Sequence, residues 1–343
     1  MTTAATANMP VHTPPSLRQR AGFAASLALA AGAFLIVGGS ALAPDSPLGA
    51  ITLLGGAGGA KTLAVAVVLA ATVAGAATVL AGRRLVDVGT FAACIGLALT
   101  SLQGGTSAVI LIAAADGQAD GTPAGVAMRF AFESAAWLLA PLAAMIVSAL
   151  VHRRLFARPR GGVRISDESD PATNAVGPAR LQLAASDLRF LATTSSAART
   201  PWAVGALHTL VASCVAMVGI HLFSAGLTNR SIQHGQACFV VLAAIFLGTW
   251  LAGRFVPVRS ALWAILAVPV VAIVGYFWAT TAGPGGSPLP DLPASPFLRI
   301  LPLQFISVGT ATAIGTAWWL RGGDGPERVG AFALGGLVAS GDS

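Results

Sequence analysis

Long apolar runs constrain this chain of 343 residues more than any other feature. A helix of about 20 apolar residues crosses roughly 30 Å of hydrocarbon, and it satisfies its backbone hydrogen bonds internally, as lipid requires. The sequence therefore predicts an all-α integral membrane protein with about eight transmembrane helices. The predicted spans are 22–43, 62–82, 86–114, 126–151, 202–225, 236–253, 259–281 and 302–320.

The composition agrees with a surface that faces lipid. Charged residues make up 10% of the chain, against roughly 25% in soluble domains, because ionised groups are costly in lipid. The net charge of +7 would favour nucleic acid as the partner of a soluble protein. Here the arginines lie in short loops between apolar runs, so we expect the lipid bilayer as partner and no nucleic acid. A membrane or cytoplasmic protein partner and the oligomeric state are left open.

Two of the apolar runs have ambiguous features. The first ends in Ala41-Leu42-Ala43, which resembles a signal-peptide cleavage site. The run is long for a signal peptide and Pro44 follows, so we expect an uncleaved first span. The third is interrupted by Gln103-Gly104-Gly105, which predicts a kink or a short re-entrant piece.

The basic residues predict the orientation of the spans, since Lys and Arg accumulate in cytoplasmic loops. With the N-terminus in the cytoplasm, sixteen basic residues fall inside and four outside. The sequence thus predicts a bacterial inner-membrane protein with both termini in the cytoplasm. The outside residues are Lys61, Arg129, Arg230 and Arg299.

A polar central segment divides the chain into two sets of four spans. Within it, 179–192 carries Leu and Ala at helical spacing, which predicts a short amphipathic helix on the inner surface. This helix could dock a partner or simply rest on headgroups. The predicted organisation is a disordered cytoplasmic tail (1–21), a first four-span half (22–151), a cytoplasmic linker (152–201), a second four-span half (202–321) and a cytoplasmic tail (322–343).

The two sets of spans share short sequence matches. The pentapeptide VVLAA occurs at 67–71 and 240–244, and LAGR occurs at 80–83 and 251–254. Arg129 and Arg299 begin the fourth span of each set, 170 residues apart. These matches favour two four-helix halves in a parallel repeat, although Ala- and Leu-rich helices also match by chance.

Ionisable and polar groups within spans are the candidate functional residues, because lipid makes them expensive. Arg129 and Glu133 lie four residues apart on the fourth span, so we expect them to share a face and to interact. Gln304 and Ser307 make the last span polar. All four are candidates to bind a solute, and a snorkelling ion pair or helix-to-helix hydrogen bonds are the structural alternatives. Tyr276 is expected in an interfacial aromatic belt.

Other patterns carry no chemistry that outweighs packing. His208 and His221 could ligate haem, but no other predicted span holds a histidine, so we expect packing histidines. The loop GGAGGAKT at 55–62 lacks the Gly before Lys that a phosphate-binding loop needs. Cys94, Cys214 and Cys238 have no ligand spacing. We therefore expect no catalytic, metal or cofactor-binding residue, no cofactor and no enzymatic activity.

The leading functional hypothesis is a small-solute permease or channel-like protein. Its basis is the number of spans, the internal repeat and the polar groups on the fourth and last spans. The alternative is a non-transporting membrane subunit or scaffold that docks partners through its cytoplasmic loop. A hydrated cavity near the midplane would distinguish the first from the second.

Overall fold

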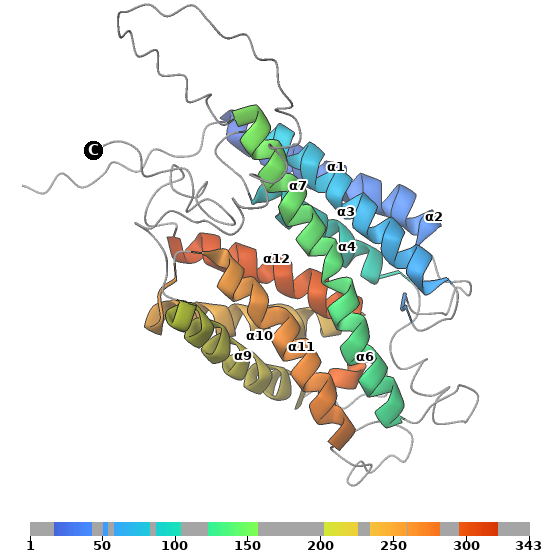
Figure 1. The fold of residues 1–343 in the computed structure, drawn as a ribbon, viewed down its shortest axis with the longest axis vertical. Helices are drawn as coiled ribbons and strands as arrows, with labels where there is room; N and C mark the ends of the chain where they lie inside the picture. Colours follow the sequence, from blue (N-terminus) through green and yellow to red (C-terminus); the bar gives the residue numbers. More distant parts are fainter. Residues whose placement is uncertain are drawn as a thin grey trace, which may run out of the picture.

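The structure is a computed structural model that describes most of the apolar part of the chain, and within that part it contains helices and no strand (Figure 1). The linker beyond Phe156, the predicted amphipathic helix at 179–192 and the C-terminal tail lie outside the described residues. The described ranges are 17–42, 51–53, 58–82, 87–103, 123–156, 202–225, 234–258, 260–281 and 295–321.

The helices form two groups along the chain, which Figure 1 separates by colour. The first group, in blue to green, is called the N-terminal group, and the second, in yellow to red, is called the C-terminal group. The N-terminal group contains α1 (Leu17–Ala33), the π-helical turn η1 (Phe34–Gly38), α2 (Gly39–Ala41), α3 (Gly59–Ala81), α4 (Val88–Ser101), α6 (Pro123–Trp137) and α7 (Leu139–Phe156). The C-terminal group contains α9 (Trp202–Ala225), α10 (His234–Phe255), α11 (Ala261–Thr281), the short 3-10 helix η2 (Pro296–Arg299) and α12 (Pro302–Arg321).

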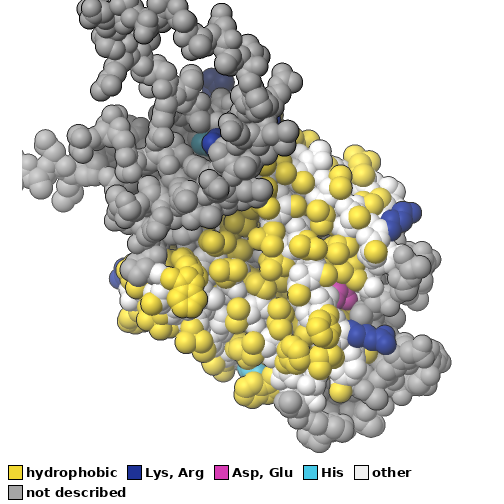
Figure 2. Space-filling model, in the orientation of Figure 1, with side chains coloured by type: hydrophobic (Ala, Val, Ile, Leu, Met, Phe, Trp, Pro, Cys, Tyr) yellow, Lys and Arg dark blue, Asp and Glu magenta, His cyan; other side chains and the backbone are white. Residues whose placement is uncertain are grey.

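Six helical segments in the described residues are long and apolar enough to cross a membrane, which indicates a multi-pass helical membrane protein. Large apolar side chains such as Phe132, Trp278 and Trp319 are exposed, and Figure 2 shows hydrophobic side chains over much of the described surface. Such a surface suits contact with lipid. The six segments are Leu17–Ala41, Gly59–Ala81, Ala124–Phe156, Trp202–Ser224, His234–Phe255 and Ala261–Thr280. Of the other two predicted spans, α4 is shorter and α12 is more polar.

Several predicted boundaries are wrong. The N-terminal tail was predicted to reach residue 21, but α1 begins at Leu17 and includes Arg18 and Arg20. The third span was predicted to run to residue 114 with an interruption at Gln103-Gly104-Gly105; α4 ends at Ser101, just before that interruption, and residues 104–114 lie outside the described residues.

The fourth span was predicted as one helix and is broken into α6 and α7 at Leu138. Pro141 explains the break, because proline has no N–H to donate to the carbonyl group of Trp137 and its ring crowds that carbonyl. The chain continues through Leu138, whose N–H bonds to the Ser134 carbonyl at 3.2 Å, so the two helices follow one another closely.

The same packing pairs occur in both groups. In the N-terminal group α1 packs on α3 and α4, and α7 packs on α3 and α4. In the C-terminal group α9 packs on α10 and α11, and α12 packs on α10 and α11. Each group is thus a four-sided bundle in which its last helix lies diagonally across from its first. The packing of α3 on α4 has no strong counterpart in the C-terminal group.

The two groups meet along a surface that we call the seam, where α12 packs on α4 and α6, and α6 packs on α11. In Figure 1 the green α6 lies along the orange α11, and α12 lies between the groups. Helices α4 and α12 are the most enclosed parts of the bundle, since nearly all their side chains are buried. They are also rich in hydroxyl groups, so the polar side chains of the spans gather near the seam.

Close approach of the helices depends on small residues. Gly89 of α4 lies against Thr78 of α3 and Ser148 of α7, so near that a methyl group at Gly89 would overlap both hydroxyls and the Ala74 carbonyl. The Thr78 hydroxyl lies 3.0 Å from that of Ser148. Such contacts replace the hydrophobic effect as the force that joins helices in lipid, where the tails are as apolar as the side chains.

Candidate functional site

Glu133 is the most unusual side chain of the described spans, because its carboxylate is 3% exposed within an apolar helix. Three groups donate hydrogen bonds to it. Oε1 accepts from the Leu53 backbone N–H at 2.8 Å and from the Trp137 indole N–H at 2.9 Å. Oε2 accepts from the Thr52 hydroxyl at 2.7 Å. All three donors are neutral, so they solvate the carboxylate without cancelling its charge.

The segment Ile51–Leu53 can approach Glu133 because the first residue of α3 is Gly59, which allows close packing of Leu53. The Cα of Gly59 lies against the Leu53 backbone, so near that an added methyl group would overlap the Leu53 carbonyl. Trp137 is four residues after Glu133 on α6 and therefore lies on the same face. The site is thus assembled from α6 and from a segment about 80 residues earlier in the chain, which the hydrogen bonds at separations of 80 and 81 residues record.

The predicted pairing of Arg129 with Glu133 is wrong in the described structure. Arg129 is exposed on α6, while the carboxylate of Glu133 is buried and receives its hydrogen bonds from Thr52, Leu53 and Trp137. The two residues are about one turn apart, but Arg129 lies on the outer side of α6, since it is exposed while Val126, Ala127 and Phe130 beside it are buried. An Arg is more stable with its head in water or headgroups than buried beside one carboxylate, because its desolvation is costly.

Tyr276 packs on α6, the helix that carries Glu133. Its side chain is fully buried and packs its ring edge-to-face on Phe130 at 5.5 Å between centroids. Its hydroxyl donates to the Ile300 carbonyl at 2.7 Å. The expected place of Tyr276 in an interfacial belt is therefore wrong, whereas Trp278, which is 58% exposed, remains compatible with such a belt.

Gln304 bridges three segments at the same end of the bundle. Its Oε1 accepts from the Leu301 N–H at 3.1 Å, and its Nε2 lies 3.4 Å from the Ser101 carbonyl and 2.7 Å from His234 Nδ1. Since an amide nitrogen only donates, His234 Nδ1 is the acceptor. Gln304 of α12 thereby joins α4 of one group to α10 of the other, across the seam.

Together these side chains form what we call the polar layer: Glu133, Trp137, Tyr276, His234 and Gln304, with Thr52, Leu53 and Ser101 as their partners. It brings together two of the four predicted site residues, Glu133 and Gln304. Arg129 lies outside it. Ser307 is fully buried one turn further along α12, and its hydroxyl donates to the Leu303 carbonyl of its own helix at 2.6 Å.

Sequence reasoning missed several members of the layer. Thr52, Ser101 and His234 lie in turns or at helix ends, where polar residues are ordinary, and their partners are remote in sequence. The contact of Trp137 with Glu133 could have been predicted, because an indole four residues after a buried carboxylate is in position to donate a hydrogen bond to it.

Two hydroxyls near the seam have no hydrogen-bond partner among the described residues. They belong to Thr90 of α4 and Thr310 of α12, which are 1% and 0% exposed. Buried hydroxyls are normally bonded, to their own helix if to nothing else. Thr310 therefore provides a bonding group in the interior of the bundle that a water or a solute can use.

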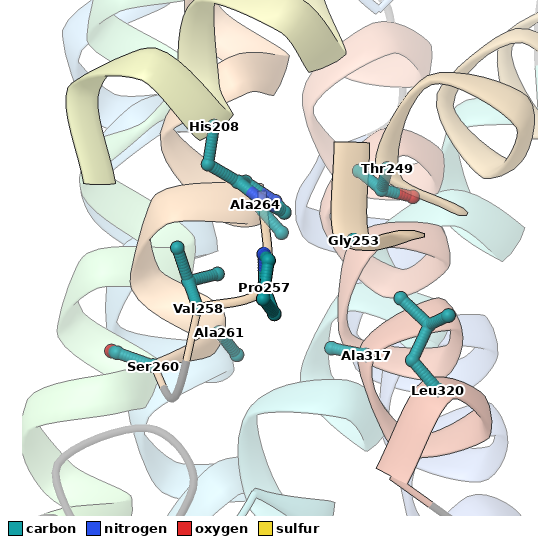
Figure 3. Close-up of a pocket in the computed structure, with 10 residues that line it drawn as sticks. All are labelled: His208, Thr249, Gly253, Pro257, Val258, Ser260, Ala261, Ala264, Ala317 and Leu320. Carbon is teal, nitrogen blue, oxygen red and sulfur yellow. The ribbon is translucent and has the colours of Figure 1, made fainter. Parts of the chain in front are cut away.

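A cleft of about 110 Å³ lies at the opposite end of the C-terminal group (Figure 3). His208, Thr249 and Ser260 supply its polar side chains, and each bonds to backbone. His208 Nδ1 lies 2.8 Å from the Val256 carbonyl, the Thr249 hydroxyl donates to the Ile245 carbonyl at 2.7 Å, and the Ser260 hydroxyl accepts from the Leu262 N–H at 3.3 Å. Because a carbonyl only accepts, His208 Nδ1 carries a proton. Most remaining walls are apolar, as at Ala261 and Leu320 in Figure 3.

The described residues contain no group of three or more His, Cys, Asp or Glu side chains that could hold a metal ion. His221 is exposed and packs edge-on against Phe297. No known family model, curated protein or solved structure matches the chain. The polar layer is therefore interpreted from its own chemistry.

Proposed function

We propose that the protein is a small-solute permease whose passage follows the seam between two four-span halves of the bacterial inner membrane. The observation that carries the proposal is the polar layer, because it places a buried carboxylate and a bridging amide where the two groups of helices meet. Membrane proteins keep such expensive groups in their interior chiefly along pathways for ions and solutes.

The internal repeat supports two equivalent halves. The match between α3 and α10 extends to six residues, TVLAGR at 78–83 and TWLAGR at 249–254, and it continues as VDVGT at 86–90 and VPVRS at 256–260 after a one-residue gap. In both helices the Thr hydroxyl donates to the carbonyl four residues earlier. In the proposed repeat, α1, α3, α4 and α6–α7 correspond to α9, α10, α11 and α12, and the repeated packing pairs support this correspondence and a total of eight spans.

This correspondence also favours a passage at the seam. Transporters built from repeats commonly place their site at the interface of the repeats and move one repeat against the other. The seam combines the hydrogen bonds of Gln304 with the aromatic contacts of Phe91 with Trp318 and of Phe130 with Tyr276. The distribution of basic residues supports a cytoplasmic position for the ends of both halves, and hence for both termini.

The test is solute flux in proteoliposomes. Purified protein is reconstituted and challenged with panels of small cations, neutral polyols and small anions, with vesicle volume followed by stopped-flow light scattering. We expect protein-dependent flux of at least one class, reduced at least tenfold by Gln304→Met and unchanged by Thr72→Val, whose hydroxyl is exposed on α3 and bonds only to the Val68 carbonyl. Flux equal to that of protein-free vesicles for all three classes would contradict the proposal.

A further inference from the structure

The three hydrogen bonds to Glu133 differ in whether they can reverse. The Leu53 and Trp137 N–H groups, both on Oε1, are donors only. The Thr52 hydroxyl, on Oε2, is a donor to the carboxylate but can rotate and accept. The two oxygens of the carboxyl group are therefore distinguished by their partners.

This arrangement suits two protonation states of one side chain. When hydronium delivers a proton to Oε2, one O–H bond of hydronium breaks, a new O–H bond forms on the carboxyl group, water is released and no oxidation state changes. The new O–H group donates to Thr52 Oγ1, while Oε1 becomes the carbonyl oxygen of the acid and keeps both N–H donors. In both states the Leu53 and Trp137 N–H groups keep Oε1 as their acceptor, and the loss of an acceptor by a buried donor would otherwise cost roughly 1–3 kcal/mol.

We propose that Glu133 is a proton-exchange site that takes up a proton on Oε2 against Thr52. Proton uptake is favoured because it removes the negative charge of the carboxylate. The described hydrogen-bond partners of Glu133 are neutral, and a buried charge without a counter-ion is costly. In the permease proposed above, and resting on that proposal, the proton is the coupling ion whose binding and release accompany solute movement.

The surroundings favour a proton over a metal ion. A hard cation needs several oxygen ligands, whereas Oε1 already accepts two N–H bonds and the neighbours Phe130 and Trp137 offer none. The other described ionisable groups of the elements around Glu133 are the phenol of Tyr276 on α11, exposed Arg129 on α6, exposed Lys61 near the start of α3, His234 at the start of α10, Arg299 before α12, and His152, Arg153 and Arg154 at the far end of α7. Among the described residues, Glu133 is therefore the one carboxyl group of the polar layer.

The test is infrared difference spectroscopy of the full-length protein in lipid nanodiscs, titrated from about pH 9 to about pH 4, a range that brackets ordinary carboxyl and imidazole titration. We expect the band of protonated carboxyl groups to grow as the pH falls and to lack one component in Glu133→Gln, since the other twelve Asp and Glu residues contribute alike to both proteins. This variant should fold, because its amide nitrogen donates to Thr52 and its oxygen keeps both N–H donors, as in the protonated acid.

Substitutions of Thr52 locate the proton. Thr52→Val removes the hydroxyl, and the carboxylate loses the stronger, charge-assisted bond, so the midpoint should move up by about 1 pH unit. Thr52→Ser should titrate like the wild type, as should the control Thr72→Val. Identical spectra for the wild type and Glu133→Gln would overturn the proposal, and an unmoved midpoint in Thr52→Val would overturn the assignment to Oε2. If the carboxyl band titrates but solute flux does not depend on a pH gradient, Glu133 is a proton-exchange site and the proton is not the coupling ion. Absence of flux with a titrating band would refute only the permease.

Discussion

Replacing Gly89 by Ala is expected to lower the free energy of unfolding by about 3 kcal/mol, the cost of overpacking an enclosed site plus one lost hydrogen bond. The added methyl group would overlap the hydroxyls of Thr78 and Ser148 and the carbonyl of Ala74. The carbonyl belongs to the backbone of α3 and cannot rotate away. Relief therefore requires α4 to move from α3 and α7, which breaks the contact between the two hydroxyls.

The measurement is unfolding by sodium dodecyl sulfate titration in mixed micelles, with Gly32→Ala as the control. Gly32 lies within α1 and has no atom within 4 Å of the position that a Cβ would take. Its replacement should be neutral or stabilising by up to about 1 kcal/mol, because Ala favours helix. Equal effects of the two substitutions would show that α4 is not packed against α3 and α7 as described.

Gln304→Met is expected to lower the free energy of unfolding by about 2 kcal/mol. The two side chains have similar length, so the change removes polar atoms and leaves no large cavity. Three contacts are lost, to Leu301, Ser101 and His234. At roughly 0.6 kcal/mol for an average hydrogen bond in a membrane bundle, they sum to about 2 kcal/mol.

Ser307→Ala is the matched control for this effect. Ser307 is also fully buried on α12, but its hydroxyl bonds only to its own helix, at the Leu303 carbonyl. Its loss should cost less than about 0.5 kcal/mol, since the carbonyl retains its helical partner. If Gln304→Met and Ser307→Ala were equally mild, Gln304 would not join the two groups of helices.

The transmembrane helices could be predicted because each apolar run is about as long as a helix that crosses a bilayer. Their ends and breaks were predicted less well. The start of α1 was placed late, since Arg18 and Arg20 read as tail, although long side chains at a helix end can extend to the headgroups. The break at Leu138 had a visible cause in Pro141 and could have been predicted.

In the candidate site, too, the features that depend on nearby residues could be predicted, and the contacts between residues remote in sequence could not. Glu133 and Gln304 could be chosen because lipid makes any polar group conspicuous. The partner of Glu133 was predicted wrongly, because Arg129 is near in sequence, whereas Thr52 and Leu53 reach the carboxylate through packing of Gly59. A sequence shows which residues are one turn apart on a helix but not how far the neighbouring helices cover that face, and this decides that Arg129 is exposed.

The most direct test of the central claim is whether water reaches the interior of the seam. Thr310 is fully enclosed, and its hydroxyl has no partner among the described residues. In a protein whose three native cysteines are replaced by Ala, Thr310→Cys in lipid bilayers should react with a small water-soluble thiol reagent. Val270→Cys, at a side chain 40% exposed on α11 and expected to face lipid, should stay unreactive because a thiol in hydrocarbon does not ionise. A Thr310→Cys variant as inert as Val270→Cys, in folded protein, would contradict a passage between the two halves.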